Sequence, residues 1–160
     1  MTGQVLDRLL TCYRIGDPES EHPIYSSTGS KLFPGRWNDA DHPVIYASEH
    51  YSTAMLEKLV HGSGRIPPKQ HYVEITIPPG VSYEVVTKDT IPDWAAADCA
   101  AARTHGVRWQ SEHRSAILIV PSVVARMENN ILINEEHRDA HRIAASLHQP
   151  VWWDSRLFQG

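Results

Sequence analysis

The chain has 160 residues, of which 41% are hydrophobic and 21% charged, and its formal net charge is −4. This length and composition suffice to bury a core, which excludes wholesale disorder and predicts one domain over residues 1–160. An acidic chain is poorly suited to nucleic acid, which attracts basic surfaces. The N-terminus lacks the apolar core of a signal peptide, and no apolar run approaches the ~18 residues of a membrane span. We therefore expect a soluble, cytoplasmic protein.

The first half of the chain predicts two strands, an irregular stretch and a helix. The strands cover 10–15 and 44–47, which are rich in β-forming residues. Between them, residues 19–41 form an unusually long irregular segment, and such segments commonly serve a function. Ser48 can cap a helix over 49–61, whose core-facing stripe would be Met55, Leu56, Leu59 and Val60.

The second half predicts four strands and one helix. Residues 71–77 and 81–87 are separated by a Pro-Pro-Gly turn, which favours a hairpin or a neighbouring pair. The alanine-rich segment 93–105 predicts a helix that Gly106 ends. Further strands are expected at 116–120 and 131–133. Strands outnumber helices and do not alternate with them regularly, so the fold class is α+β with a mainly antiparallel sheet.

Two arginines have surroundings that favour anion binding. Arg14 ends the first strand, and Arg36 lies in the irregular segment between a glycine and a tryptophan. A guanidinium can bind two diphosphate oxygens with parallel charged hydrogen bonds, which lysine does less well. The alternative is that each arginine packs on a neighbouring aromatic ring, Tyr13 or Trp37, or pairs with a surface carboxylate.

Four further side chains suit the chemistry of a glycosidic bond. Glu57 could bind a ribose hydroxyl and stabilise an oxocarbenium ion, or it could simply pair with Lys58 or His61 on its helix. His61 is also a candidate ligand of the substrate. Tyr46 could stack on a flat heteroaromatic ring or pack in the core. Ser122 could bind a phosphate or an amide, or serve only the turn after its strand.

Taken in order, six short segments of the chain resemble the RES domain family. They are Tyr13-Arg14, Gly35-Arg36-Trp37-Asn38, Val44-Ile45-Tyr46-Ala47-Ser48, Leu56-Glu57, Val120-Pro121-Ser122 and Asp154-Ser155-Arg156-Leu157. The resemblance implies a fold similar to ADP-ribosyltransferases and a toxin that destroys NAD+ or transfers its ADP-ribose. It also implies a partner antitoxin with an Xre-like DNA-binding domain.

The resemblance implies a role for each matched residue. Its arginine, glutamate and serine fall on Arg14, Glu57 and Ser122, its second arginine on Arg36 and its aromatic residue on Tyr46. Glu57, Arg14 and Tyr46 would then be catalytic. The same arginines and tyrosine, with Ser122 and His61, would bind NAD+ as substrate.

The chain departs from the family pattern in two places, and the secondary structure of its tail, residues 142–158, is ambiguous by periodicity alone. Pro34-Gly35 replaces a glycine pair, and Asp41 replaces a glycine of the following turn, which affects the shape of the loop more than the chemistry. The resemblance further suggests a strand near 143–147.

Other readings of the sequence stay open. His137 and His141 are spaced as metal ligands on a helix would be, but no third ligand is evident, so we expect no metal. A ribonuclease-type toxin could use Arg14, Glu57 and His61 without a cofactor, and a non-catalytic module could act by binding a protein. The acceptor of ADP-ribose could be a protein, water or phosphate.

Overall fold

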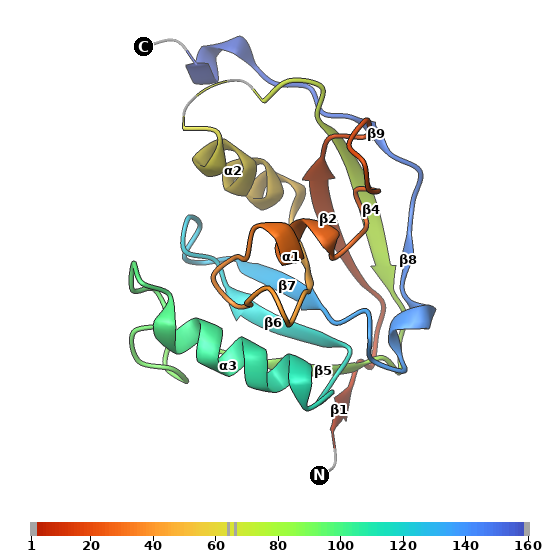
Figure 1. Ribbon diagram of the computed structural model, residues 1–160. Coiled ribbons are helices and arrows are strands. Elements are labelled where there is room, and N and C mark those ends of the chain that lie inside the picture. Colours follow the sequence, from red (N-terminus) through yellow and green to blue (C-terminus); the bar gives the residue numbers. More distant parts are fainter. Residues whose placement is uncertain (1–2, 64, 66, 159–160) are drawn as a thin grey trace.

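A curled β-sheet runs through the protein and joins strands that lie far apart in sequence (Figure 1). The computed structural model describes residues 3–63, 65 and 67–158. In spatial order the strands are β1 (Gln4–Val5), β5 (Ser82–Val85), β6 (Ile117–Pro121), β7 (Asn129–Ile133), β3 (Ile45–Ser48), β2 (Leu10–Gly16), β4 (His71–Ile77) and β8 (Ala144–Ala145), with β9 (Gln149–Pro150) also on β4. Strands β5 and β6 are parallel, and the other printed pairs are antiparallel. The predicted α+β class with a mainly antiparallel sheet is confirmed.

Among the described residues, three α-helices and two short 3-10 helices accompany the sheet. They are α1 (Thr28–Leu32), α2 (Tyr51–His61), α3 (Ala100–Ser111), η1 (Ala140–Arg142) and η2 (Ser155–Phe158). Helix α2 packs against β2 and β3, whereas α3 lies along the β5–β6 side of the sheet (Figure 1). Within the described ranges, no helix has the length and apolar character needed to cross a membrane.

The central strands bury both of their faces. On β6, Ile117 packs with Ile45 and Ile75 in one cluster, and the next residue, Leu118, packs with Trp109 of α3 in a second cluster. Because both faces are covered, a continuous apolar run replaces the usual alternation of apolar and polar residues. Strand β4 instead turns one apolar face inward, and its other face carries polar side chains such as Glu74.

The predicted helix over 93–105 is wrong at both ends. Residues 93–99 form turns, and α3 begins after Cys99, whose φ of 60° interrupts regular helix. The helix also continues through Gly106, where a Cβ atom would overlap the backbone carbonyl of Trp37. Gly106 is therefore a point of close approach between α3 and the irregular segment, and it does not end the helix.

Two further expectations are wrong because long-range pairing overrides local signals. Strands β4 and β5 are not a hairpin, since β4 pairs with β2 and β5 pairs with β1 and β6. Ser48 belongs to β3, and His50 precedes the first turn of α2. The tail does form a strand near the expected place, as β8.

We expect Gly106→Ala to lower the free energy of unfolding by at least about 2 kcal/mol, because α3 must move away from Trp37 to admit the methyl group. Helix propensity alone predicts the opposite sign, since alanine is about 1 kcal/mol better than glycine within a helix. Urea denaturation measures the change. Thr104→Ala, at an exposed position of the same helix, is the control and should be neutral or slightly stabilising. Equal stability of Gly106→Ala and the wild type would contradict the close contact.

Candidate functional site

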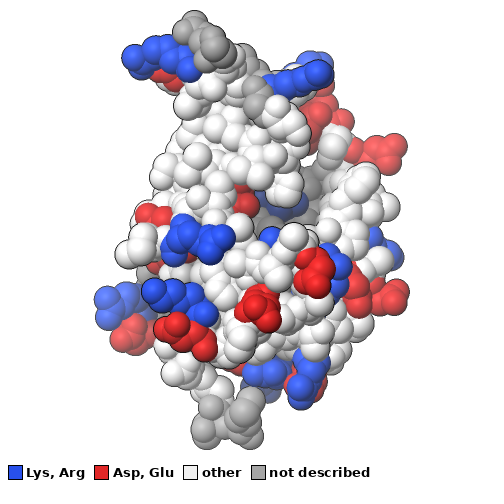
Figure 2. Space-filling view, turned by 90° about the vertical axis from the view of Figure 1, so that its left-hand side faces the viewer, with Lys and Arg blue, Asp and Glu red and all other residues white. Residues whose placement is uncertain are grey.

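A pocket of about 680 Å³ opens between α2, the segment 33–37, the start of α3 and the ends of β2 and β3. Figure 2 shows this side of the molecule, with Lys and Arg atoms in the depth of a hollow and largely uncharged surface around it. Five of the six predicted site residues line the pocket, namely Arg14, Arg36, Tyr46, Glu57 and His61. The chain folds so that a strand, a loop and a helix each contribute to one cavity.

The pocket is cationic although the protein is acidic. Its charged lining consists of four basic side chains and one carboxylate: Arg14, Arg36, Lys58, Arg103 and Glu57. Burial lowers the pKa of Lys58, and the charge of Arg14 lowers it further, whereas Asp17 opposes the shift. Like charges gathered in a partly buried space favour an anionic ligand, because the ligand would relieve their repulsion.

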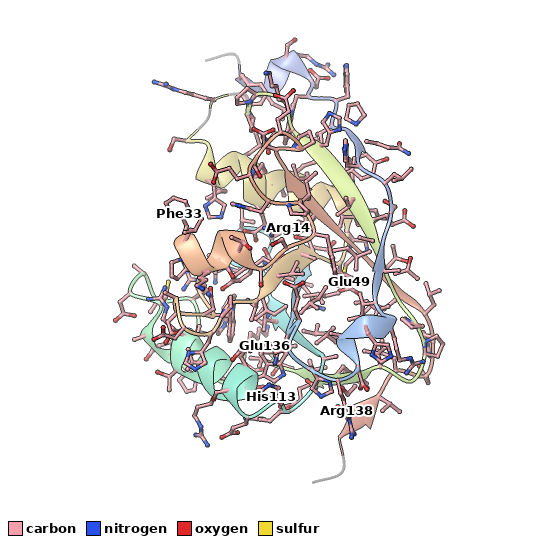
Figure 3. The ribbon with its side chains drawn as sticks, turned by 45° about the vertical axis from the view of Figure 1, so that its right-hand side comes forward. Arg14, Phe33, Glu49, His113, Glu136 and Arg138 are labelled. Carbon is pink, nitrogen blue, oxygen red and sulfur yellow. The ribbon has the colours of Figure 1, made fainter. Side chains whose placement is uncertain are left out.

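Arg14 is held by backbone carbonyls and not by a carboxylate. Its Nε donates to the carbonyl of Ile24 at 2.7 Å, and Nη1 donates to that of Tyr46 at 2.8 Å. Among the described residues, Arg14 forms no salt bridge with a carboxylate. Burial lowers its pKa, but a guanidinium keeps its proton at physiological pH. The side chain therefore keeps its charge, which the carboxylate of Glu135 favours without a direct ion pair. Figure 3 shows it between β2 and α1.

Arg36 and Arg103 are oriented in the same way. Nη1 of Arg36 donates to the carbonyls of Trp94 at 3.1 Å and Ala96 at 2.7 Å. Arg103, on α3, donates to the carbonyls of Asn38 and Gly35, each at 2.8 Å. Nothing in the alanine-rich surroundings of Arg103 marks it in the sequence as a site residue. Only the docking of α3 on the irregular segment brings it to the pocket.

Tyr46 organises the segment that carries Arg36. Its hydroxyl donates to Oδ1 of Asn38 at 2.7 Å and accepts the backbone N–H of Trp37 at 3.0 Å. A Cβ atom on Gly35 would lie 2.7 Å from the tyrosine oxygen, so only glycine permits this approach. Burial raises the pKa of Tyr46, which keeps the hydroxyl protonated. The ring lines the pocket while the hydroxyl is used by the loop.

Glu57 is held through one of its two carboxylate oxygens. Oε1 accepts the hydroxyl of Ser122 at 2.8 Å and the side-chain amide of Asn130 at 3.0 Å. Among the described residues, no hydrogen bond reaches Oε2. Ser122 is fully buried behind Glu57, so in this structure its hydroxyl contacts the glutamate and not the cavity. In this structure Ser122 therefore supports Glu57 together with Asn130, which no pattern in the sequence marks. The contact of Ser122 with substrate stays a prediction.

The orientation of α2 differs from the predicted one. The expected core stripe is wrong: Leu56 and Val60 are 42% and 60% exposed, while Thr53 and Ala54 are buried. This rotation directs Glu57 into the pocket, with Lys58 and His61 also on its wall. Apolar side chains stand at the rim, including Phe33, which is 81% exposed and projects beside α1 (Figure 3).

The histidines considered as metal ligands lie away from this pocket. His137 is buried, and its Nδ1 accepts the backbone N–H of Asp139. His141 donates from Nδ1 to the carbonyl of Arg138. Nδ1 of each ring is thus engaged by backbone. Over the described parts of the chain, no group of three or more His, Cys, Asp or Glu residues is arranged to hold a metal ion.

Known proteins resemble this chain in sequence and in fold. Residues 11–154 match the RES domain. The chain is 36% identical over 139 residues to a Prs ADP-ribosylating toxin of Sphingobium sp. (strain YBL2), covering 84% of this chain and 86% of the relative. It is 32% identical over 133 residues to a toxin Res of Photorhabdus laumondii, covering 81% and 85%. The crystal structure of the M. tuberculosis MbcT–MbcA toxin–antitoxin complex contains a chain with a TM-score of 0.67 and 17% identity, with coverage of 92% and 86%. The chain therefore shares its fold with that chain of the toxin–antitoxin complex, in line with the predicted α+β class.

We expect Tyr46→Phe to destabilise the protein by about 1–2 kcal/mol, because the N–H of Trp37 loses its hydrogen-bond partner. The midpoint of urea denaturation measures the effect. Tyr13→Phe is the matched control, since no hydrogen bond to its hydroxyl occurs among the described residues, and its stability should stay within ~0.5 kcal/mol of the wild type. If both variants unfold at the same urea concentration, the hydroxyl of Tyr46 does not hold the segment.

Proposed function

We propose that this chain, which belongs to the RES domain family, is the toxin of a toxin–antitoxin pair and cleaves the nicotinamide–ribose bond of NAD+. The observation that carries the proposal is the pocket itself, in which four basic side chains surround a single fixed carboxylate. NAD+ combines a diphosphate with a glycosidic bond whose cleavage develops positive charge. Such a substrate needs cations at one end of its site and an anion at the other.

In this proposal the arginines bind the diphosphate and Tyr46 faces the nicotinamide ring. Arg14 spends two of its five N–H groups on backbone carbonyls, so three remain for the ligand. The carbonyls fix the guanidinium plane before substrate arrives, and this removes part of the entropic cost of binding. A cavity of about 680 Å³ is in the size range of small-molecule sites.

Glu57 would act at the reacting ribose. The bond from C1′ to nicotinamide breaks with its electron pair on the nicotinamide nitrogen, which becomes neutral. The ribose is left as an oxocarbenium ion, which the carboxylate stabilises. Oε2 meanwhile accepts a hydrogen bond from a ribose hydroxyl. A nucleophile of the acceptor then bonds to C1′ and releases its proton.

We further propose that a protein is the acceptor, with water replacing it when no protein is present. The name of the 36% identical relative describes transfer of this kind. Nicotinamide release with and without cell lysate, together with labelling of protein by NAD+ radiolabelled in its ADP-ribose half, separates transfer from hydrolysis. The partner would be an antitoxin, as in the toxin–antitoxin complex whose chain shares the fold, and its Xre-like character follows from the family resemblance.

Glu57→Gln should reduce nicotinamide release at least ~100-fold, equivalent to about 2.7 kcal/mol of transition-state stabilisation, because the amide cannot offset the developing positive charge. Glu74→Gln, which removes the same charge from the exposed face of β4, should be as active as the wild type. In cells, expression of the wild type should lower NAD+ and stop growth, and Glu57→Gln should do neither. Growth arrest by a folded Glu57→Gln protein would mean that toxicity comes from binding.

Arg14→Lys should lower kcat/KM for NAD+ at least ~10-fold, or about 1.4 kcal/mol, although the charge is kept. An ammonium group cannot hold the carbonyls of Ile24 and Tyr46 and still present a planar pair of donors. Arg138→Lys is the control and should retain full activity, because Arg138 does not line the pocket and lies well away from Arg14 in Figure 3. Full activity of Arg14→Lys would exclude a bidentate role for Arg14.

A further inference from the structure

We propose that Asn130 is a positioning residue that holds the carboxylate of Glu57 so that Oε2 faces the substrate, and that Ser48 holds Asn130 in turn. This inference rests on the proposed function, because it assigns the orientation of the group that acts on the ribose. Asn130 lies outside the six segments by which the chain resembles its family, and Ser48 ends one of them without a role assigned to it.

Asn130 is placed by the sheet. It lies on β7 directly opposite Ser48 of β3 in the antiparallel ladder, and both residues reach the wall of the pocket. The hydroxyl of Ser48 donates to Oδ1 of Asn130 at 2.8 Å, and Nδ2 of Asn130 donates to Oε1 of Glu57 at 3.0 Å. Ser48 is 4% exposed, so this chain of hydrogen bonds begins in the protein interior.

The direction of these hydrogen bonds follows from the charge of Glu57. An ionised carboxylate only accepts hydrogen bonds, so the amide must turn its NH₂ group toward Glu57 and its oxygen toward Ser48. The hydroxyl of Ser48 supplies the donor that the amide oxygen then requires. Both ends of the Asn130 amide are therefore used by the protein, which makes its role one of orientation.

The two donors to Glu57 converge on a single oxygen. Ser122 follows β6 and Asn130 lies on β7, and these two strands pair with each other. Each strand of the hairpin therefore supplies one hydrogen-bond donor to Oε1. Two hydrogen bonds to one oxygen fix the rotation of the carboxylate, and Oε2 remains for the ligand. A carboxylate that needs no reorientation in the transition state is worth more than a mobile one.

The decisive variant is Asn130→Asp, which keeps the shape of the side chain and replaces the donor by a second carboxyl group. Two carboxyl groups at hydrogen-bond distance share a proton, so the pair loses its full charge at a higher pH than either alone. We expect the acidic limb of the pH profile of nicotinamide release to move up by at least about one pH unit. Activity on that limb then falls about tenfold and recovers as the pH rises.

Asn129→Asp is the matched control, because it makes the same change one residue earlier on the same strand. The amide of Asn129 bonds to Glu49 and not to Glu57, and it does not line the pocket. Its pH profile should coincide with that of the wild type. Arg14 of β2 and Lys58 and His61 of α2 share the pocket with Glu57. The titration of the Glu57 carboxyl carbon by NMR therefore shows whether the displaced limb belongs to the carboxylate pair.

The outcomes separate this inference from the proposed function. A wild type that releases no nicotinamide overturns the proposed function, whereas an unchanged Glu57 titration in Asn130→Asp overturns the positioning role, whatever the activity. Coincident pH profiles for the two aspartate variants also overturn it. If circular dichroism shows that Asn130→Asp does not fold, Ser48→Ala replaces it as the test. We expect kcat of Ser48→Ala to fall at least about fivefold with KM unchanged, because the Asn130 amide loses the hydrogen bond that orients it. Wild-type kcat in Ser48→Ala would contradict the proposal.

Discussion

The hydrogen bond from the hydroxyl of Tyr46 to Asn38 holds residues 34–38 over the sheet, and the part of the pocket that these residues form with α3 depends on it. Gly35 permits the approach, and the carbonyls of Gly35 and Asn38 then receive Arg103 from α3. The carbonyl of Trp37 meets α3 at Gly106, where a side chain would not fit. Residues 34–38 have no regular secondary structure, but hydrogen bonds from their backbone groups to the side chains of Tyr46 and Arg103 fix their position.

Backbone carbonyls are the common partners of the three arginines in the pocket, Arg14, Arg36 and Arg103. A carboxylate would hold an arginine equally well but would cancel its charge, whereas a carbonyl orients the guanidinium and leaves the charge for a ligand. The one carboxylate, Glu57, is held by neutral donors, Ser122 and Asn130. Opposite charges therefore coexist in one cavity, each supported by neutral groups, and this arrangement suits a substrate that carries negative charge at rest and gains positive charge in reaction.

Local patterns predicted the strands well and the helices less well. The apolar runs that became β2, β4 and β6 are found within about a residue of their predicted ends, because such runs have no other way to be buried. Helix α2 was found, but its buried face was not, since Leu56 and Val60 are exposed, Val60 at the pocket, while Thr53 and Ala54 are buried. Hydropathy marks apolar residues whether they fill a core or surround a binding site.

By itself, the sequence determined the α+β class and the residue types of the site, because alternation, turn residues and a family motif are all local properties of the chain. Only the tertiary structure decided that β4 pairs with β2 while β5 pairs with β6. It alone also placed Lys58, Arg103 and Asn130 in the lining of the pocket. It also decided that Ser122 supports Glu57 from behind. Pairing across the sheet and the docking of α3 bring together residues that lie far apart in the sequence, such as Asn130 and Glu57, which are 73 positions apart. Contacts of that span depend on the packing of the whole core, which no segment of the chain encodes alone.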